Sequence, residues 1–322
     1  MVKSMSILDR AANVRSRTMQ LRNIWLAAFG TLTLAVAPFV HAQGGQDFSK
    51  VEITTAKLAD NFYVMEGRGG AIGVLTGPDG ILMVDGEFAP LTPKIVAAIK
   101  QISSQPIKYL IDTHDHGDHT GGNENFAKLG ATIVAREEVR ERLAHPHPGA
   151  NGAPGTPAPA AALPTITYEG RMDIHFDGED VQLIQVPPAH TDNDTLVYFP
   201  KADVIMAGDY FNSDQYPYID REDGGTLKGM LDGMSMLIGM AGPNTKIVPG
   251  HGHVADRNRA IAVRDLILVT RDRVAAMVAE GKTLDEVIAA KPMADYDAKF
   301  ADGPRTTVRF LTQLYAELKA AK

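Results

Sequence analysis

The sequence predicts a single α/β domain in which two β-sheets pack face to face and helices cover the outside. Two observations carry this prediction. Strand-like apolar runs alternate with helical runs in both halves of the chain, and residues suited to metal binding follow several of these strands. Side chains at strand ends can project from a rigid sheet into a shared crevice. The second observation therefore also predicts a site at the sheet edges.

In the N-terminal half, apolar alternation predicts the strands and 3.6-residue spacing predicts the helices. A Pro-Asp-Gly turn divides the run 71–86 into two strands, and a run at 107–113 ends just before a histidine-rich motif. The remaining elements are strands at 57–67 and 131–135, and helices at 91–103, 123–130 and 136–144.

The C-terminal half opens with a Pro-, Ala- and Gly-rich segment, 145–164, which predicts a surface loop or flap. Strands are expected at 172–178, 181–188, 195–200 and 204–209, followed by a helix at about 226–241. An apolar run at 245–252 precedes helices that fill most of 256–320.

Residues 1–42 have the pattern of a secretory signal peptide, and the single predicted domain covers 43–322. Five basic residues and one acid precede the uncharged run 24–40, and Val40 and Ala42 form an A-x-A-like cleavage site. A start at Met19 would give a leader of ordinary length. The alternative is an uncleaved membrane anchor, which needs about 20 apolar residues. We expect a cleaved leader and a periplasmic or secreted protein.

The charge and cysteine content exclude one class of partner and one kind of metal ligand. The whole chain has a net charge of −7, and removal of residues 1–42 changes it to −11. Nucleic-acid phosphates would repel such a domain, so we expect no nucleic-acid partner. The chain has no cysteine, so a metal site must be built from histidine and carboxylate ligands.

The segment 111–123, IDTHDHGDHTGGN, concentrates candidate ligands directly after a predicted strand. In an extended loop, side chains at i and i+2 point the same way, so His114 and His116 can meet one metal ion. Asp118 and His119 would then turn toward a neighbouring position. A solvated loop has no need of this spacing, and neutral imidazoles with carboxylates suit Zn²⁺.

One loop cannot complete two metal spheres, so further ligands are expected downstream. His190, Asp209 and His251 each follow an apolar run. Together with the first motif they provide five histidines and two aspartates, which are enough for two metals with Asp209 between them.

The H-x-H-x-D-H motif with these downstream residues resembles the metallo-β-lactamase superfamily over nearly the whole chain after the leader. The resemblance implies a four-layer αβ/βα sandwich with a binuclear metal site at one edge. It implies that His114, His116 and His190 hold the first metal, that Asp118, His119 and His251 hold the second, and that Asp209 bridges them. Asp85 matches a carboxylate that orients a ligating imidazole, although it could equally be a turn aspartate before Gly86.

Some residues of this chain differ from those of particular members of the superfamily, and these differences limit the activities that the resemblance implies. The di-iron flavoproteins carry Glu at the place of His116, which disfavours electron transfer, and one subclass of true β-lactamases needs a cysteine ligand. Asp209 makes the site similar to glyoxalase II and the metallo-lactonases. Glyoxalase II is expected where glutathione thioesters occur, so an export signal argues against that activity.

The resulting hypothesis is an exported binuclear zinc hydrolase in which a hydroxide between the metals cleaves an ester, lactone, thioester or β-lactam. Asp118 is the expected catalytic carboxylate, and no G-x-S-x-G nucleophile motif is found. The cofactors expected are two Zn²⁺ ions, although the ligands also suit iron or manganese. The alternatives are an iron-dependent dioxygenase of the same fold and a non-catalytic metal-binding protein. A small-molecule substrate is the only partner expected, without stable membrane insertion, and the sequence leaves the oligomeric state open.

Other histidines and tyrosines are weaker candidates. His145 and His147 are interpreted as surface histidines or parts of a substrate flap, and His175 as structural. His253 competes with His251 for the ligand role. The remaining candidates, for pocket lining or packing, are Tyr210, Tyr216 and Tyr218.

The leader hypothesis predicts where the secreted protein begins. Cleavage after Ala42 would leave Gln43 at the N-terminus, and mass spectrometry of protein exported by its host should find that residue first. An intact leader on the exported protein would instead support the membrane anchor.

Overall fold

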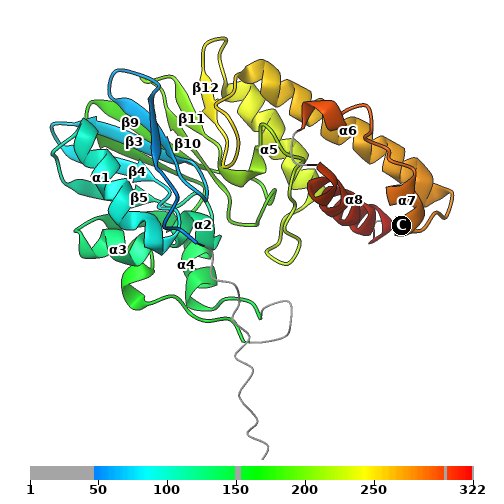
Figure 1. Ribbon diagram of the computed structural model, residues 1–322, viewed down its shortest axis with the longest axis horizontal. Coiled ribbons are helices and arrows are strands. Elements are labelled where there is room, and N and C mark those ends of the chain that lie inside the picture. The colour runs from blue at the N-terminus through cyan, green and yellow to red at the C-terminus, as the bar shows by residue number, and fades with distance from the viewer. Residues whose placement is uncertain (1–46, 149–153, 301–302, 321–322) are drawn as a thin grey trace, which may run out of the picture. The chain divides into compact units, whose positions relative to one another are not determined.

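Two β-sheets form the centre of the computed structural model, which describes residues 47–148, 154–300 and 303–320 (Figure 1). The predicted leader and its boundary at residue 42 lie outside these residues. The first sheet has strands in chain order: β1 (Thr54–Lys57), β2 (Phe62–Glu66), β3 (Ile72–Gly77), β4 (Gly80–Val84), β5 (Ile107–Ile111), β6 (Thr132–Arg136) and β7 (Ile166–Tyr168). Strands β1 to β4 pair antiparallel, whereas β4 to β7 pair parallel.

The second sheet runs in the order β12-β11-β10-β9-β8. Its strands are β8 (Arg171–Phe176), β9 (Glu179–Gln185), β10 (Thr195–Phe199), β11 (Val204–Met206) and β12 (Lys246–Val248). β11 and β12 are parallel, and the other neighbours are antiparallel. The carboxyl ends of β9, β11 and β12 therefore lie at one edge of this sheet.

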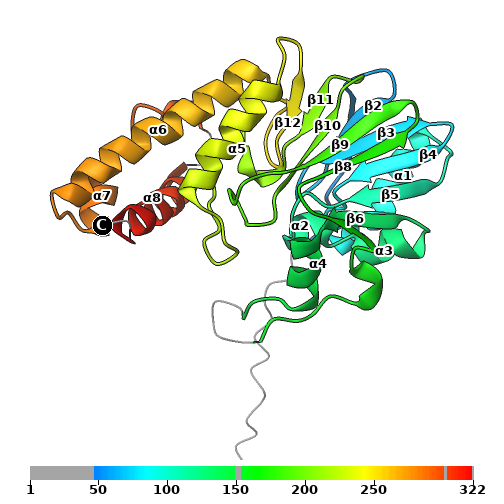
Figure 2. The same cartoon turned by 180° about the vertical axis from the view of Figure 1, so that it is seen from behind.

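The helices lie on the outer faces of the sheets and at one end of the second sheet (Figures 1 and 2). They are α1 (Thr92–Ile102), α2 (Gly117–Thr120), α3 (Asn123–Lys128), α4 (Glu137–Ala144), α5 (Leu227–Met240), α6 (Arg257–Ala279), α7 (Leu284–Ala289) and α8 (Gly303–Ala320). Short 3₁₀ turns are η1 (Ala89–Leu91), η2 (Ala160–Ala162), η3 (Gly208–Tyr210) and η4 (Asp297–Lys299). None of the helices in the described part of the chain is long and apolar enough to span a membrane.

Successive side chains along each strand point to opposite faces of the sheet, and this divides the core into layers. In β4, Leu82 and Val84 face the second sheet, whereas Ile81 and Met83 face α1 and α3. Phe62 meets Phe199 between the sheets, with ring centroids 4.5 Å apart. Leu196, Ile205 and Ile247 of the second sheet pack instead against α5 and α6. The predicted α/β sandwich of two facing sheets with outer helices is therefore confirmed.

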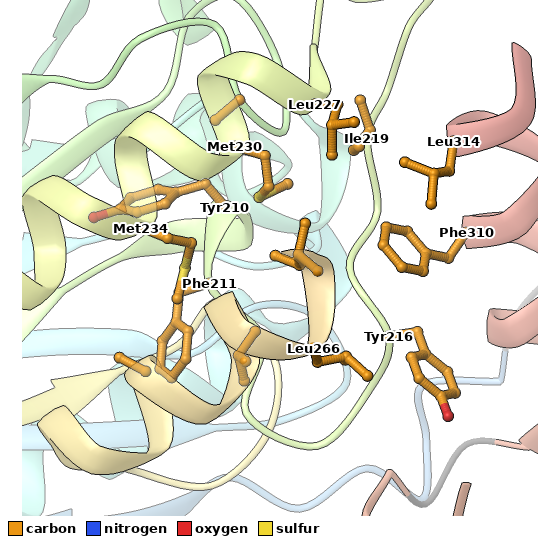
Figure 3. Packing of buried hydrophobic residues seen from close by; sticks show 14 of the residues in the cluster. Tyr210, Phe211, Tyr216, Ile219, Leu227, Met230, Met234, Leu266, Phe310 and Leu314 are labelled. Carbon is orange, nitrogen blue, oxygen red and sulfur yellow. The ribbon is translucent and has the colours of Figure 1, made fainter. Parts of the chain in front are cut away.

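The same apolar cluster attaches α8 to the rest of the fold. Phe310 and Leu314 of α8 point toward Ile219, in the long loop between η3 and α5, and toward Leu227, the first residue of α5 (Figure 3). Tyr216 of the same loop stacks on Phe300, with ring centroids 5.1 Å apart. The loop between η3 and α5 is thus held between the second sheet and α8.

Some local predictions were wrong. The predicted strand at 57–67 is divided by a turn, with β1 ending at Lys57 and β2 beginning at Phe62. The segment Ile166–Tyr168, for which we predicted no strand, pairs with β6 as an edge strand. The motif was predicted as a loop, extended at His114 and His116 and turning at Asp118 and His119; the turn is one of helix, Gly117–Thr120, in which Gly121 N–H bonds back to the Gly117 carbonyl.

Candidate metal centre

The predicted ligands gather where the carboxyl ends of strands from both sheets meet. The motif 114–119 follows β5, His190 follows β9, and Asp209 and His251 follow β11 and β12. Backbone hydrogen bonds join the two edges: Thr195 N–H donates to the Thr113 carbonyl at 2.8 Å, and Ala71 N–H donates to the Gly250 carbonyl at 2.8 Å. The site is therefore built on rigid elements of both sheets.

The first group consists of His114, His116 and His190. One ring nitrogen of each lies within 4.8 Å of the others, and His190 Nε2 is 3.0 Å from His116 Nδ1. His114 and His190 are buried, whereas His116 is partly exposed. Three imidazoles converging on one point can bind a metal ion such as Zn²⁺.

The second group consists of Asp118, His119 and His251, whose ligand atoms also lie within 4.8 Å of one another. His251 Nε2 is 3.2 Å from Asp118 Oδ2. The loop at Gly70 passes directly beneath His119, since a Cβ atom on Gly70 would lie 2.1 Å from His119 Cε1. Only glycine fits there, so the backbone supports one position of the imidazole ring.

Asp209 lies between the two groups. Its Oδ1 is 3.1 Å from His119 Nε2, and its Oδ2 is 3.4 Å from His251 Nε2 and 3.7 Å from His190 Nε2. The tight approach of Gly250 positions it: a Cβ atom there would lie 1.9 Å from Asp209 Oδ1. One carboxylate thus faces nitrogens from both groups.

Hydrogen bonds on the far side of the rings determine which nitrogen faces the centre. Asp85 Oδ2 is 2.8 Å from His119 Nδ1 and also accepts from the Thr113 hydroxyl at 2.8 Å. Because that hydroxyl donates to Asp85, it accepts from His114 Nδ1 at 3.1 Å. His190 Nδ1 donates to the Tyr218 carbonyl at 2.9 Å. His114, His119 and His190 therefore all present Nε2 to the centre.

The sequence left two interpretations of Asp85 open, and the geometry of the residue is compatible with both. The residue turns the chain with φ 63°, a conformation that Asp tolerates, and its carboxylate contacts the His119 ring.

Two carboxylates that the sequence analysis missed contact His116. Its Nε2 lies 3.4 Å from both Asp220 Oδ2 and Asp223 Oδ2, which leaves Nδ1 facing His190. Asp223 is itself paired with Arg142 of α4. No local spacing signals this contact, because Asp220 and Asp223 come from the long loop before α5.

The charges around the centre favour a cation. Burial lowers the pKa of His119, but Asp85 and Asp209 outweigh burial and raise it. For His251, the Asp209 charge is the largest influence and raises the pKa to about 10. Burial raises the pKa of Asp118, but the hydrogen bond with His251 and the His119 charge hold it at about 2. Burial, together with the neighbouring charge of His116, lowers the pKa of His190 to about 4, although Asp209 opposes the shift. The carboxylates thus stabilise positive charge at the point where the rings converge.

Unpaired buried atoms at the centre match a metal ion. Within the described ranges, His114 Nε2, His119 Nε2 and Asp209 Oδ1 are buried and lack a hydrogen-bond partner. Each unsatisfied buried polar group costs about 1–3 kcal/mol, and metal ions at the two groups would satisfy all three atoms. All three atoms are lone-pair donors, so the residues fit divalent metal ions of the Zn²⁺ type.

The centre opens into one cavity of about 270 Å³. Asp118 and His251 lie at its floor with side chains 28% and 27% exposed, whereas His119 is fully buried. The other lining residues are His116, Asp209, Asn212, Gln215, Tyr218, Arg305 and Arg309. A small molecule in the cavity can therefore approach the second group directly.

Of the weaker sequence candidates, only Tyr218 lies at the centre. His145 is exposed near Glu141, and His147 lies 3.7 Å from Asp223 with half its surface exposed. His175 bonds to Asp180 of the neighbouring strand, and His253 is 94% exposed beside Asp214. Tyr210 and Tyr216 are core residues, and Tyr218 lines the cavity.

A model of the metallo-beta-lactamase superfamily matches residues 61–258, which is more than half of the chain. The chain belongs to this superfamily. The family resemblance seen in the sequence is therefore confirmed, together with the fold class that it implied. All of the predicted metal-binding residues fall inside the matched segment.

The named relatives that this chain matches are distant in sequence. The 2,4-dinitroanisole O-demethylase subunit alpha of Nocardioides sp. (strain JS1661) is 30% identical over 43% of this chain and 42% of its own. The linear primary-alkylsulfatase of Pseudomonas sp. (strain ATCC 19151) is 23% identical over 67% of this chain and 48% of its own. This chain thus spans less than half the length of these two relatives.

A solved metallo-beta-lactamase from Pontibacter korlensis shares the fold. Its TM-score is 0.54 at 19% identity, over 67% of this chain and 99% of that one. At this identity the likeness establishes the fold alone.

The contact between Asp85 and His119 generates a test. Asp85→Asn keeps the size and tolerates the positive φ, but it removes the charge that orients His119. We expect zinc affinity at the second group to fall about 10–100-fold, as for other residues that orient metal ligands. The measurement is a zinc titration against a competing chelator, with thermal unfolding of the metal-free variant to check its fold.

The matched control is Asp214→Asn, which removes the carboxylate beside the exposed His253. It should leave zinc affinity unchanged. Unaltered affinity in Asp85→Asn would mean that this aspartate serves only the turn.

Proposed function

We propose that the protein is a hydrolase with a binuclear zinc centre that cleaves a carbonyl substrate: an ester, lactone, thioester or β-lactam. One observation carries the proposal: a single carboxylate, Asp209, lies 3.1–3.7 Å from ring nitrogens of two groups of three candidate ligands. A purely structural metal site is normally closed and complete with four ligands. Here the second group faces a cavity, as a catalytic site requires.

In this proposal His114, His116 and His190 hold the first ion, Asp118, His119 and His251 hold the second, and Asp209 contacts both. Two bound zinc ions would supply a water molecule of lowered pKa and positive charge beside the carbonyl oxygen. Neighbouring residues of the chain orient the imidazole rings that would hold these ions. Asp85 and the Tyr218 carbonyl fix the orientation of His119 and His190 through their Nδ1 atoms.

Asp118 is the proposed catalytic carboxylate. Its side chain lies at the cavity floor, 3.2 Å from His251, and is partly exposed. An acceptor at this position can bind the attacking water by a hydrogen bond and direct it toward the substrate. The buried rings of His114, His119 and His190 exclude bulk water from the other side of the centre.

Family members support a hydrolytic reaction, since the relatives include an alkylsulfatase and metallo-beta-lactamases. The nitrogen and oxygen ligands also suit iron or manganese, so metal analysis of the isolated protein is part of the test. We further propose that the protein acts outside the cytoplasm, in the periplasm or as a secreted enzyme, on the strength of the leader-like residues 1–42.

The bridging carboxylate provides the test of the binuclear centre. Asp209→Asn keeps the side-chain size but removes the charge shared between the two metals. Second-zinc occupancy should fall at low free zinc, and turnover should drop by about 100-fold or more, the order seen when one preorganised electrostatic group is removed. Zinc stoichiometry and turnover of chromogenic ester, lactone, thioester and cephalosporin substrates are measured in one zinc buffer.

The control is His147→Ala, on the exposed loop after α4, which should leave the zinc content unchanged and alter at most substrate binding. Two zinc ions with near-normal turnover in Asp209→Asn would contradict the bridging role. Wild-type protein that binds iron instead and consumes oxygen would favour a dioxygenase.

A further inference from the structure

The cavity above the proposed metal centre is closed on one side by α8, which lies beyond the residues matched by the superfamily model. The loop before α5 fixes the position of this helix. The Gln313 side chain accepts from Ile219 N–H at 3.1 Å, and Glu317 accepts from Leu227 N–H at 2.8 Å. Phe310 adds apolar packing to the same contact (Figure 3). The helix therefore faces the loop in a defined register.

Two arginines continue this face of the helix toward the metal centre. Arg305, Arg309 and Gln313 are spaced four residues apart, so they lie along one side of α8. Both arginines line the same cavity as Asp118, Asp209 and His251. The helix thus adds two guanidinium groups to a cavity whose floor is formed by proposed metal ligands.

Arg309 is also held in place by a residue that belongs to the centre. Its guanidinium carbon lies 4.3 Å from the centroid of the Tyr218 ring, a cation–π contact. The carbonyl of Tyr218 accepts the hydrogen bond from His190 Nδ1. The position of Arg309 is therefore linked through one residue to a proposed ligand of the first metal.

The cavity lining contains positively charged side chains, although the chain as a whole is acidic. The chain has a net charge of −7, yet Arg305 and Arg309 both line this cavity. The two aspartates in the lining, Asp118 and Asp209, both face imidazole nitrogens. With two divalent ions at the centre, the lining would be strongly positive. Guanidinium groups pair with planar oxyanions through two parallel hydrogen bonds, and Asn212 and Gln215 add further amide donors.

We propose that Arg305 and Arg309 bind an anionic group of the substrate, a carboxylate or a sulfate-type oxyanion, while the bond to be cleaved lies over the metal centre. This inference rests on the proposed function for the location of the reaction. The anion binding itself requires no turnover, so it can be measured separately.

Binding of three compounds of similar size tests the inference on the full-length, zinc-loaded protein. The probes are benzoate, benzenesulfonate and neutral benzyl alcohol, none of which carries a hydrolysable bond, and calorimetric titration gives each Kd. We expect the anions to bind at least about tenfold more tightly than benzyl alcohol. The tighter of the two anions identifies whether the site prefers a carboxylate or a sulfate-type group.

The double variant Arg305→Gln/Arg309→Gln should weaken anion binding about tenfold or more, with benzyl alcohol binding and zinc content unchanged. Because Arg309 packs on Tyr218, the single variant Arg305→Gln is measured as well; Arg305 is exposed, so its substitution should not affect folding. The matched control is Arg271→Gln on α6, which removes the same charge from a residue outside the cavity lining.

The outcomes separate the two proposals. If the double variant and Arg305→Gln both bind the anions as tightly as wild type, or if Arg271→Gln weakens them equally, the anion site is wrong whatever the turnover. If anion binding depends on Arg305 and Arg309 but the protein neither retains two zinc ions nor cleaves any substrate, the proposed function fails while the anion site stands.

Discussion

A carboxylate that is largely removed from water must face positive charge, and Asp209 is placed under that constraint. Its side chain is 11% exposed and lies between 3.1 and 3.7 Å from nitrogens of His119, His190 and His251. An unpaired buried charge costs several kcal/mol, so this arrangement is stable only with protons or metal ions to offset it.

The surrounding backbone is arranged to keep Asp209 in this position. Gly208 adopts φ 57°, a left-handed conformation suited to glycine, and Gly250 N–H donates to the Gly208 carbonyl at 2.8 Å. Because Gly250 lies against Asp209 Oδ1, any side chain at position 250 would clash with the Asp209 carboxylate. The segments that follow β11 and β12 thus pack closely against each other around Asp209.

Much of the fold and the candidate ligand set could be predicted because the relevant signals are local. Each ligand follows a short apolar strand, and the sequence places His114, His190, Asp209 and His251 just after such runs. The helical turn at Gly117–Thr120 was missed because it is only four residues long and begins with glycine, yet it does not alter which residues converge. The edge strand β7 was missed because only three residues carry it.

The residues that sequence reasoning missed depend on long-range packing. Asp220 and Asp223 reach His116 only because the loop before α5 folds back across the site. Arg305 and Arg309 lie more than 50 residues after His251, and their place at the cavity follows from how α8 packs on that loop. No periodicity or motif encodes such a contact, so the sequence could indicate the candidate ligands but not the residues that line the cavity around them.

X-ray absorption spectroscopy at the zinc edge, on protein loaded with two equivalents, tests whether two metal ions share Asp209. We expect nitrogen and oxygen neighbours at about 2.0–2.2 Å and a zinc–zinc distance of about 3.5–4 Å. Binding of a single zinc ion, or of two ions without zinc–zinc scattering at that distance, would contradict it.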